Sequence, residues 1–432
     1  MEISALYEAF LRYPLAVTDS RAAVPGSLFF ALKGARFDGN RFAAEALCKG
    51  SVMAVIDDPS YRKDERYVLV DNVLDSLQKL AVFHRKQMKA RIIAVTGTNG
   101  KTTTKELIKA CLSKRYHAAG TEGNLNNHIG VPLTLLRLKY NDETAVIEIG
   151  ANHPQEITML CNIADPDDGI ITNIGRAHIE GFGSFEGVRK AKGELYDYLA
   201  GRRKTIFVNG NDPVLAQMAV SFPGNVFYYG DHRNTVVSGK VIKMDPFMSF
   251  DLFFPGKEIL RVNTQITGRY NFDNFLAAAC ISTVFNVSQT DILQAFETYK
   301  PGNMRSQLLE TQSNLVFLDS YNANPSSVGA AVASFVELPA TCRVIILGEM
   351  LELGSHSVSE HKAILRLIDT CDVNHVFLVG PVFKKMKVSG KYSLFNDSDE
   401  LAVYLREHPV AGSSILVKGS RLMALEKVVP FL

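Results

Sequence analysis

The sequence predicts an α/β protein of three domains, and three observations support this prediction. The chain has 432 residues, of which 47% are hydrophobic and 21% charged, so it can bury substantial cores but is too long for a single one. From Arg91 onward, apolar strands alternate with amphipathic helices, which is the pattern of a parallel sheet with right-handed crossovers. A Pro-Gly-Asn turn at residues 301–303 interrupts this alternation, which then resumes. We therefore expect domains at residues 1–88, 89–303 and 304–432.

The first domain is expected to be a small α/β unit. Short apolar strands are predicted at residues 27–32, 52–56 and 67–70, with helices at 42–48 and 75–88. In the central domain the strands IIAVTG, TAVIEIG, GIITNIG and KTIFVNG alternate with the helical segments KTTTKELIKACLSKR, ITMLCNIA and GVRKAKGELYDYLAG. This alternation predicts a parallel sheet covered by helices.

The helical pattern stops between residues 234 and 266. The segments VVSGKVIKM, MSFDLFF and EILRVNTQI there have the alternating pattern of strands and predict an antiparallel addition to the central sheet. Helices are expected at 271–285 and 289–299. In the third domain the strands NLVFLDS, CRVIILGEM, HVFLVGP and SILVKGS predict a dinucleotide-fold-like sheet.

Composition and charge exclude several classes of protein. The net charge of +2 arises from 47 basic and 45 acidic residues without a basic block, so nucleic acid is not an expected partner. No apolar run is long enough to span a membrane, and the N-terminus lacks the basic start of a signal peptide. The six cysteines form no CxxC pair, which predicts neither a disulfide framework nor a zinc site and fits a cytoplasmic protein.

A phosphate-binding loop is predicted where the apolar strand 92–95 runs into TGTNGKTTTKEL and a helix. Glycines let backbone N–H groups approach phosphate oxygens, Lys101 can reach the β and γ phosphates, and the Thr102 hydroxyl can hold magnesium. The usual G-x-x-x-x-G-K-[ST] pattern has a glycine where this chain has Val95, and Gly97 lies inside the loop instead. The expected nucleotide contacts are Gly97, Thr98, Asn99, Gly100, Lys101, Thr102 and Thr103.

The loop GTNGKT, with its displaced glycine, resembles the phosphate loop of the Mur ligase family. Further stretches that follow in the family's order are EGNLNNHIGVPLTLLRL, VIEIGANHPQEI, ITNIGRAHIEGFGSFEGVRKAKGEL, ITGRYNFDNFLAAA and DSYNANPSSVGAA, which together span nearly the whole chain. The resemblance implies an ATP-dependent ligase of cytoplasmic cell-wall (peptidoglycan) synthesis. In such a ligase a carboxylate is activated as an acyl phosphate and is then attacked by an amine.

The resemblance also implies a magnesium-dependent centre. Glu148 ends a strand, where a carboxylate can complete an oxygen shell for Mg²⁺ with Thr102 and phosphate oxygens. His178 resembles the family's second-magnesium histidine. Lys192, in RKAKGEL, matches a lysine that is carbamylated in the family and so becomes a carboxylate-like ligand. Without the resemblance, Lys192 would be interpreted as part of a solvated helix face.

Other stretches match the family's nucleotide contacts. Asn271 and Asn274 match asparagines beside adenine, although Tyr270 stands where a histidine is common. Arg305 resembles an arginine that stabilises charge on the transferred phosphoryl group. Asp319 resembles a carboxylate that the third domain brings to the nucleotide, and Lys418 ends a strand from which it can reach a phosphate or the incoming substrate.

The substrates are implied by two parts of the chain. The segment 18–47 resembles the uridine-nucleotide-binding domain of ligases that extend a long peptide stem, with the candidate contacts Asp19, Ser20, Arg21, Lys33, Gly34, Asp38 and Gly39. SYNANPSS and LGEMLELGSHSVSEH are similar to family members that add D-alanyl-D-alanine to UDP-N-acetylmuramoyl-tripeptide. Further substrate candidates are Asn126, Asn127, Tyr321, Asn322, Asn324, Glu352 and His361. We expect these two substrates, ATP and Mg²⁺, and a monomeric chain.

Two alternatives remain open at this point. A P-loop kinase of small metabolites would need neither the uridine-type first domain nor the AHIEGFGS to AKGE stretch. A degenerate ligase that only binds nucleotide or other proteins would be expected to lose Lys101, Glu148, His178 or Lys192, and this chain retains all four.

Overall fold

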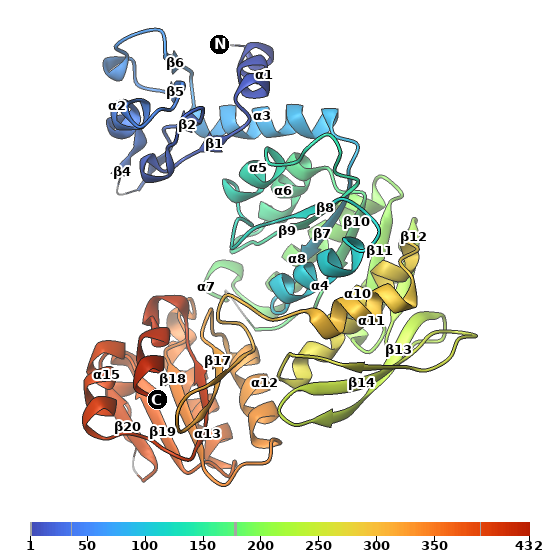
Figure 1. The fold of residues 1–432 in the computed structure, drawn as a ribbon, viewed down its shortest axis with the longest axis vertical. Coiled ribbons are helices and arrows are strands. Elements are labelled where there is room, and N and C mark those ends of the chain that lie inside the picture. Colours follow the sequence, from blue (N-terminus) through green and yellow to red (C-terminus); the bar gives the residue numbers. More distant parts are fainter. Residues whose placement is uncertain (1, 36, 177–178, 389) are drawn as a thin grey trace.

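The three-domain α/β architecture is confirmed in a computed structural model, which describes residues 2–35, 37–176, 179–388 and 390–432 (Figure 1). It contains a four-stranded, a nine-stranded and a six-stranded sheet, and a two-stranded hairpin in the first part of the chain. No helix among the described residues is both long enough and apolar enough to cross a bilayer.

The first sheet is parallel, in the order β1-β2-β5-β6. Its strands are β1 (Ala16–Val17), β2 (Leu28–Phe30), β5 (Met53–Ile56) and β6 (Tyr67–Leu69), and the hairpin is β3 (Lys33–Gly34) with β4 (Phe37–Asp38). The helices are α1 (Ile3–Arg12), α2 (Ala43–Cys48) and α3 (Val73–Gln87). Helix α3 packs against α1 and also against two helices of the central region, so it joins the two parts of the molecule.

The nine-stranded sheet has the order β15-β14-β13-β12-β11-β10-β7-β9-β8. Its strands are β7 (Arg91–Thr96), β8 (Ala118–Gly120), β9 (Thr144–Glu148), β10 (Asp168–Ile171), β11 (Thr205–Asn209), β12 (Asn225–Tyr229), β13 (Thr235–Met244), β14 (Met248–Phe253) and β15 (Leu260–Asn263). Pairing is parallel from β8 to β13, whereas β13, β14 and β15 are antiparallel. The predicted antiparallel addition is therefore confirmed, and it continues the parallel sheet without a break.

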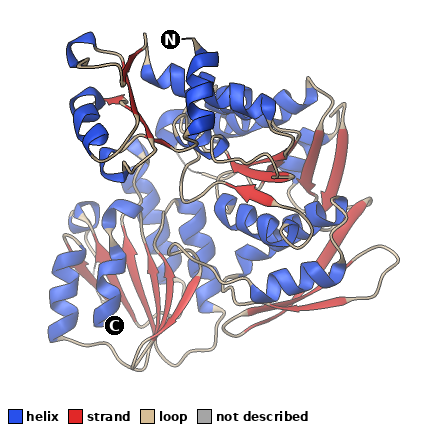
Figure 2. Ribbon diagram, turned by 45° about the horizontal axis from the view of Figure 1, so that its top comes forward, coloured by secondary structure: helices blue, strands red, loops and turns tan. Residues whose placement is uncertain are grey.

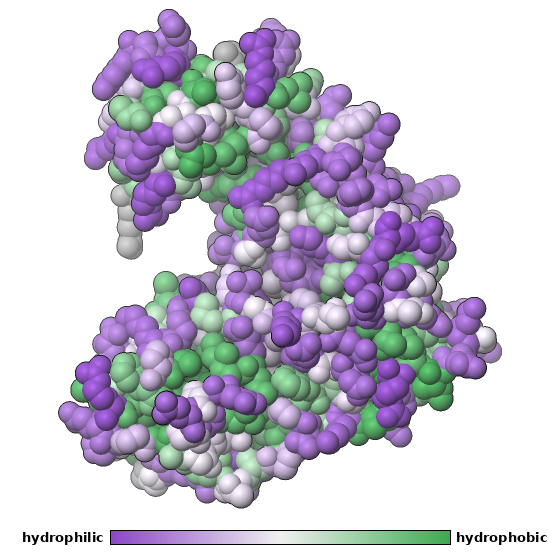
Figure 3. Space-filling model, viewed as in Figure 1, coloured by the Kyte–Doolittle hydropathy of each residue, from purple (hydrophilic) through white to green (hydrophobic). Residues whose placement is uncertain are grey.

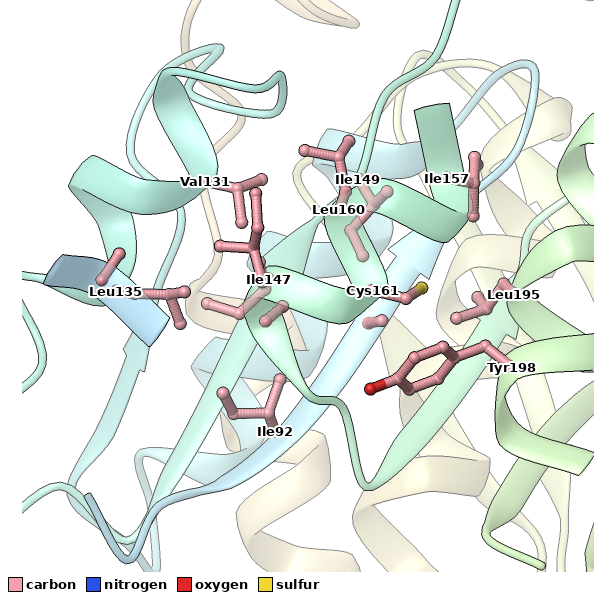
Figure 4. Packing of buried hydrophobic residues seen from close by; sticks show 14 of the residues in the cluster. Ile92, Val131, Leu135, Ile147, Ile149, Ile157, Leu160, Cys161, Leu195 and Tyr198 are labelled. Atoms are coloured by element: carbon pink, nitrogen blue, oxygen red, sulfur yellow. The ribbon is translucent and has the colours of Figure 1, made fainter. Parts of the chain in front are cut away.

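Helices cover both faces of this sheet. They are α4 (Lys101–Leu112), α5 (Gly130–Leu135), α6 (Glu156–Ala164), α7 (Ile179–Phe182), α8 (Phe185–Ala200), α9 (Pro213–Ala219), α10 (Phe272–Val284) and α11 (Gln289–Thr298). Along β7, Ile92 and Ala94 belong to one core cluster and Ile93 and Val95 to the other, because successive side chains of a strand point to opposite faces. Figure 4 shows the first cluster, in which Ile92 and Ile147 lie near Cys161 and Tyr198.

The third sheet is also covered by helices on both faces (Figure 2). Its order is β16-β17-β21-β18-β19-β20, and only the pairing of β16 is antiparallel. The strands are β16 (Gln307–Glu310), β17 (Leu315–Asp319), β18 (Arg343–Gly348), β19 (His375–Val379), β20 (Tyr392–Phe395) and β21 (Ser414–Lys418). The helices are α12 (Pro325–Val336), α13 (Ser357–Asp369), α14 (Pro381–Lys384) and α15 (Ser398–Glu407).

Candidate active site

A cleft of about 640 Å³ lies where carboxyl ends of strands in the central and third sheets approach one another. This is the edge at which ligands bind in open α/β sheets. The predicted residues that line the cleft are Thr98, Asn99, Gly100, Lys101, Thr102, Thr103, Asn126, Asn127, Glu148, Asn271, Asn274, Arg305, Asp319, Tyr321, Asn322 and Asn324. Lys418 and Glu352 line it as well.

The phosphate loop, residues 97–103, follows β7 and is held against the segment after β10. Gly97 has φ +141°, and a Cβ there would lie 2.0 Å from the Thr172 hydroxyl oxygen. Thr98 N–H donates to the Asn173 carbonyl (3.0 Å), and Asn99 N–H donates to Asn173 Oδ1 (3.0 Å). The displaced glycine is therefore needed for the close approach of these two segments.

Lys101 begins α4, whose N-terminal end faces the cleft. Its ammonium donates to the carbonyls of Gly97 (2.8 Å) and Thr98 (3.1 Å). Burial lowers the pKa of Lys101, and the nearby Glu148 carboxylate opposes this shift. A helix N-terminus and a lysine at one point create a positive potential that suits phosphate.

Glu148 and Thr102 meet behind the loop. Glu148 is 2% exposed, and its two carboxylate oxygens accept from the Thr102 hydroxyl and the Asn126 amide, both at 2.8 Å. Among the described residues no three His, Cys, Asp or Glu side chains form a cluster suited to a metal. A magnesium ion that keeps several waters and takes phosphate oxygens needs only one or two protein oxygens, so the Thr102–Glu148 pair fits it.

Lys192 lies in α8 and is also 2% exposed. Its Nζ donates to the Ala151 carbonyl (3.3 Å) and lies 5.5 Å from the centre of the Phe182 ring. Burial lowers its pKa to about 7, and the positive charge of Lys101 adds to this effect. This lysine is thus a core residue and not part of a solvated face. His178 lies outside the described residues.

Two predicted adenine-side residues form a chain of hydrogen bonds between α4 and the third domain. Asn274 Oδ1 accepts from the Thr104 hydroxyl (3.0 Å), and Asn274 Nδ2 donates to Asn271 Oδ1 (3.0 Å). Asn271 Nδ2 donates in turn to Ser306 Oγ (2.9 Å), which also bonds the Tyr270 hydroxyl (3.0 Å). The sequence did not single out Thr104 or Ser306, although Ser306 directly follows the predicted Arg305.

The third domain brings charged groups to the same cleft. The Arg305 guanidinium stacks 3.8 Å from the centre of the Tyr321 ring. Lys418 Nζ pairs with Asp319 Oδ2 (3.0 Å) and donates to the Asn322 carbonyl (2.8 Å). Asp319 and Lys418 are neighbours in register on β17 and β21, which explains why two residues 99 positions apart act as a pair.

The candidate uridine-side residues lie in the first domain and do not line this cleft. Asp19 pairs with Arg21 (2.7 Å), Lys33 pairs with Asp57 (2.9 Å), and Asp38 Oδ1 accepts from Asn40 N–H. Ser20 is buried, and Gly34 belongs to the β3–β4 hairpin. A Cβ on Gly39 would meet the Leu32 carbonyl oxygen at 2.4 Å. The candidate His361, also outside the cleft, is buried and bonds Met350 N–H (2.9 Å).

Family models match three consecutive parts of the chain. They are the Mur ligase family catalytic domain at residues 16–98, the Mur ligase middle domain at 95–282 and the Mur ligase glutamate ligase domain at 304–421. The chain belongs to the Mur ligase family. This membership confirms the resemblance that the loop and the ordered motifs indicated.

This Mur ligase is similar over most of its length to several named relatives. It is 35% identical to the UDP-N-acetylmuramoyl-tripeptide--D-alanyl-D-alanine ligase of Bacillus subtilis, over 95% of this chain and 91% of the relative. It is 36% identical to the enzyme of the same name from Escherichia coli, over 95% and 92%. A crystal structure of MurF from Acinetobacter baumannii matches with a TM-score of 0.87 and 29% identity, over 99% and 97%. MurF of Thermotoga maritima in complex with ADP matches with a TM-score of 0.84 and 26% identity, over 98% and 97%.

Proposed function

We propose that this Mur ligase uses ATP to join D-alanyl-D-alanine to UDP-N-acetylmuramoyl-tripeptide, which gives the pentapeptide, ADP and phosphate in peptidoglycan synthesis. The observation that supports this most is the position of Lys101, the Thr102–Glu148 pair and Arg305 around one cleft. Relatives that cover more than nine-tenths of this chain carry that activity in their names. A kinase of small metabolites is disfavoured, because the family's first and third domains are both matched.

The proposed reaction has two steps. The free carboxylate of the tripeptide attacks the γ-phosphorus of ATP, so that ADP leaves and an acyl phosphate forms. The amine of D-alanyl-D-alanine then attacks the acyl carbon, phosphate leaves, and the amine loses a proton. Lys101 and Arg305 would offset the negative charge that develops on the transferred group, while Asn271, Asn274 and Asp319 would hold the rest of the nucleotide.

Thr102 and Glu148 would hold Mg²⁺, which when bound would neutralise phosphate charge during the transfer. We propose that Lys192 is carbamylated and, with His178, contributes to a second ion. The burial of Lys192 supports this: the residue is 2% exposed, and a buried ammonium is costly unless it is paired and fully hydrogen-bonded. The ammonium would first lose one proton to give the neutral amine. Addition of that amine to CO₂, with loss of a second proton, would give a carbamate anion.

The substrates would approach from two sides. We assign UDP-sugar binding to residues 1–88 through Asp19, Ser20, Arg21, Lys33, Gly34, Asp38 and Gly39, and ATP binding to residues 89–303. We assign the dipeptide side to residues 304–432, where Tyr321 and Asn322 line the cleft. Asn126 and Asn127 face the same cleft from the central sheet and would contact the peptide end of the tripeptide. We propose that the enzyme acts as a monomer in the cytoplasm.

A two-substrate assay tests this function. ATP hydrolysis should require both UDP-N-acetylmuramoyl-tripeptide and D-alanyl-D-alanine, and mass spectrometry should find the pentapeptide. Diaminopimelate or lysine, offered with the dipeptide-stem nucleotide, should give no product. A chain that prefers the single amino acid would be a different member of the family, and a stable phosphoester product would indicate a kinase.

A further inference from the structure

Helix α12 of the third domain begins at the cleft with an asparagine that caps it. Asn324 Oδ1 accepts from Ser327 N–H (2.8 Å), and Ser327 Oγ accepts from Asn324 N–H (3.0 Å). These reciprocal bonds form a capping box, which satisfies backbone donors that the first turn of a helix leaves unpaired. The carboxamide oxygen is therefore used within α12, while the carboxamide nitrogen remains available to another partner.

That partner belongs to the phosphate loop. Asn324 Nδ2 donates to Asn99 Oδ1 (2.8 Å) across the boundary between the third domain and the central sheet. Asn99 is held in place independently, because its backbone carbonyl accepts from Thr172 Oγ1 (2.6 Å) and Asn173 Nδ2 (3.0 Å) and its N–H donates to Asn173 Oδ1 (3.0 Å). The acceptor that Asn324 contacts is thus fixed relative to β10 as well as to the loop.

A second contact brings the same end of α12 to the segment that follows β10. Arg176 N–H donates to Ser326 Oγ (3.0 Å), and the Arg176 side chain lies 3.6 Å from Glu360 of α13. The first turn of α12 therefore meets both central segments that build the phosphate site. A displacement of the third domain from the central sheet would break both contacts.

We propose that Asn324 is a positioning residue, which clasps the third domain onto the phosphate loop through Asn99. This proposal rests on the proposed function. It assigns Asn324 to holding the phosphate loop, in place of the predicted contact with the dipeptide. Asp319 and Tyr321 lie within five residues of Asn324, and Tyr321 stacks on Arg305. Fixing the start of α12 against Asn99 therefore fixes the groups that would face the nucleotide and the transferred phosphoryl group.

The substitution Asn324→Asp separates the two roles of the side chain. A carboxylate keeps the acceptor that caps α12, but it removes the N–H donor and places an oxygen against Asn99 Oδ1. We expect an unchanged melting temperature and a fall of about five- to tenfold in kcat/KM for ATP, the usual size of one lost hydrogen bond. Asn99→Ala should give a similar loss, because the backbone bonds of residue 99 remain. The kcat/KM of the double variant should be no lower than that of the more impaired single variant, because both changes remove the same hydrogen bond.

Asn72→Asp is the matched control, because Asn72 caps the exposed start of α3 through the same type of bond, to Asp75 N–H (2.8 Å). It should change neither stability nor kinetics. Wild-type kinetics in Asn324→Asp, or losses of kcat/KM that multiply in the double variant, would overturn the proposal.

Small-angle scattering with ADP tests the Asn324–Asn99 contact without turnover. Asn324→Asp should have a larger radius of gyration than the wild type, and an equal radius would count against the proposal. An inactive wild type would instead overturn the proposed function.

Discussion

At the scale of single residues, burial changes the chemistry of Lys192. A lysine amine reacts with CO₂ only in its neutral form, and burial lowers the pKa of Lys192 to about 7. A large fraction is therefore neutral near neutral pH, unlike an exposed lysine with its pKa near 10.5. The sequence alone placed this residue on a solvated face; the three-dimensional packing against the segment around Ala151 makes it a core residue.

We predict that Lys192→Ala abolishes ligase activity and that bicarbonate raises the activity of wild-type enzyme prepared at low CO₂. Nuclear magnetic resonance with ¹³C-labelled bicarbonate should detect a carbamate carbon in the wild type and none in the variant. Lys190→Ala is the matched control, because Lys190 is exposed on the same helix, and it should retain both activity and signal. Full activity of Lys192→Ala would contradict the proposed role.

Gly97 permits a second prediction at this scale. Its φ of +141° is unfavourable for other residues, and a Cβ would overlap the Thr172 hydroxyl. Gly97→Ala should therefore displace the phosphate loop, weaken ATP binding by at least about tenfold and destabilise the protein by roughly 2 kcal/mol. Calorimetric titration and thermal unfolding measure both effects. Gly201→Ala, where the contacts of an added Cβ are ordinary, should behave like the wild type.

At the scale of elements, the sequence predicted the buried strands better than the edge strands. The segments that became β7, β9, β10 and β11 are continuous apolar runs, which is typical of strands buried on both faces. By contrast, β8 (Ala118–Gly120) is Ala-Ala-Gly and has no strand pattern; it is a strand because it pairs with β9. Helix α1 was also not predicted, although Leu6, Tyr7 and Phe10 lie at helical spacing and form its buried face.

The candidate site was predictable where a residue ends a strand or belongs to a loop motif. Glu148 and Lys101 are of this kind, because local pattern places them at the carboxyl edge of the sheet. The Asn99–Asn324 bond joins residues 225 positions apart, and the bond between Ser306 and Tyr270 depends on how two domains dock. No local pattern encodes such contacts, so only the folded chain reveals them.

The contact between α1 and α3 leads to a prediction about how stability depends on pH. His84 of α3 is buried, with Nε2 bonded to the Leu138 carbonyl (2.9 Å) and Nδ1 to the Tyr7 hydroxyl (3.2 Å). Burial lowers the pKa of His84 below the ordinary 6.5. In the pH range between the lowered value and 6.5, the unfolded chain binds a proton that the folded chain does not, so acid favours unfolding.

The contribution of His84 to stability should therefore be complete above pH 6.5 and should be lost as the pH falls below that value. Urea unfolding at a series of pH values should show this decline in the wild type and a smaller one in His84→Gln, whose side chain does not titrate. The variant His117→Gln, at an exposed position, should keep the wild-type profile. An identical pH profile for His84→Gln would show that another group causes the decline.

At the scale of the whole molecule, the central and third domains already meet, whereas the first domain stands apart from the third. Figure 3 shows a deep hollow in the surface between these two outer domains. The cleft is lined by central and third-domain residues, and the candidate UDP-sugar contacts lie outside it. In the proposed function, a tripeptide bound by the first domain would have to bring its carboxylate to Lys101, so the substrate would have to bridge the distance from the first domain to the cleft.

Closure of the first domain should therefore depend on the substrate that bridges the hollow. Small-angle scattering should find a smaller radius of gyration with a non-hydrolysable ATP analogue plus UDP-N-acetylmuramoyl-tripeptide than with the analogue alone. Helix α12 of the third domain already contacts the phosphate loop without the tripeptide, so the decrease should come from movement of the first domain. With the analogue plus UDP, which lacks the peptide, the radius should stay near that of the analogue complex, because UDP bound to the first domain is expected to be too short to bridge the hollow. An unchanged radius with both ligands would mean that the substrate spans the hollow in an extended form and that no large domain movement precedes the reaction.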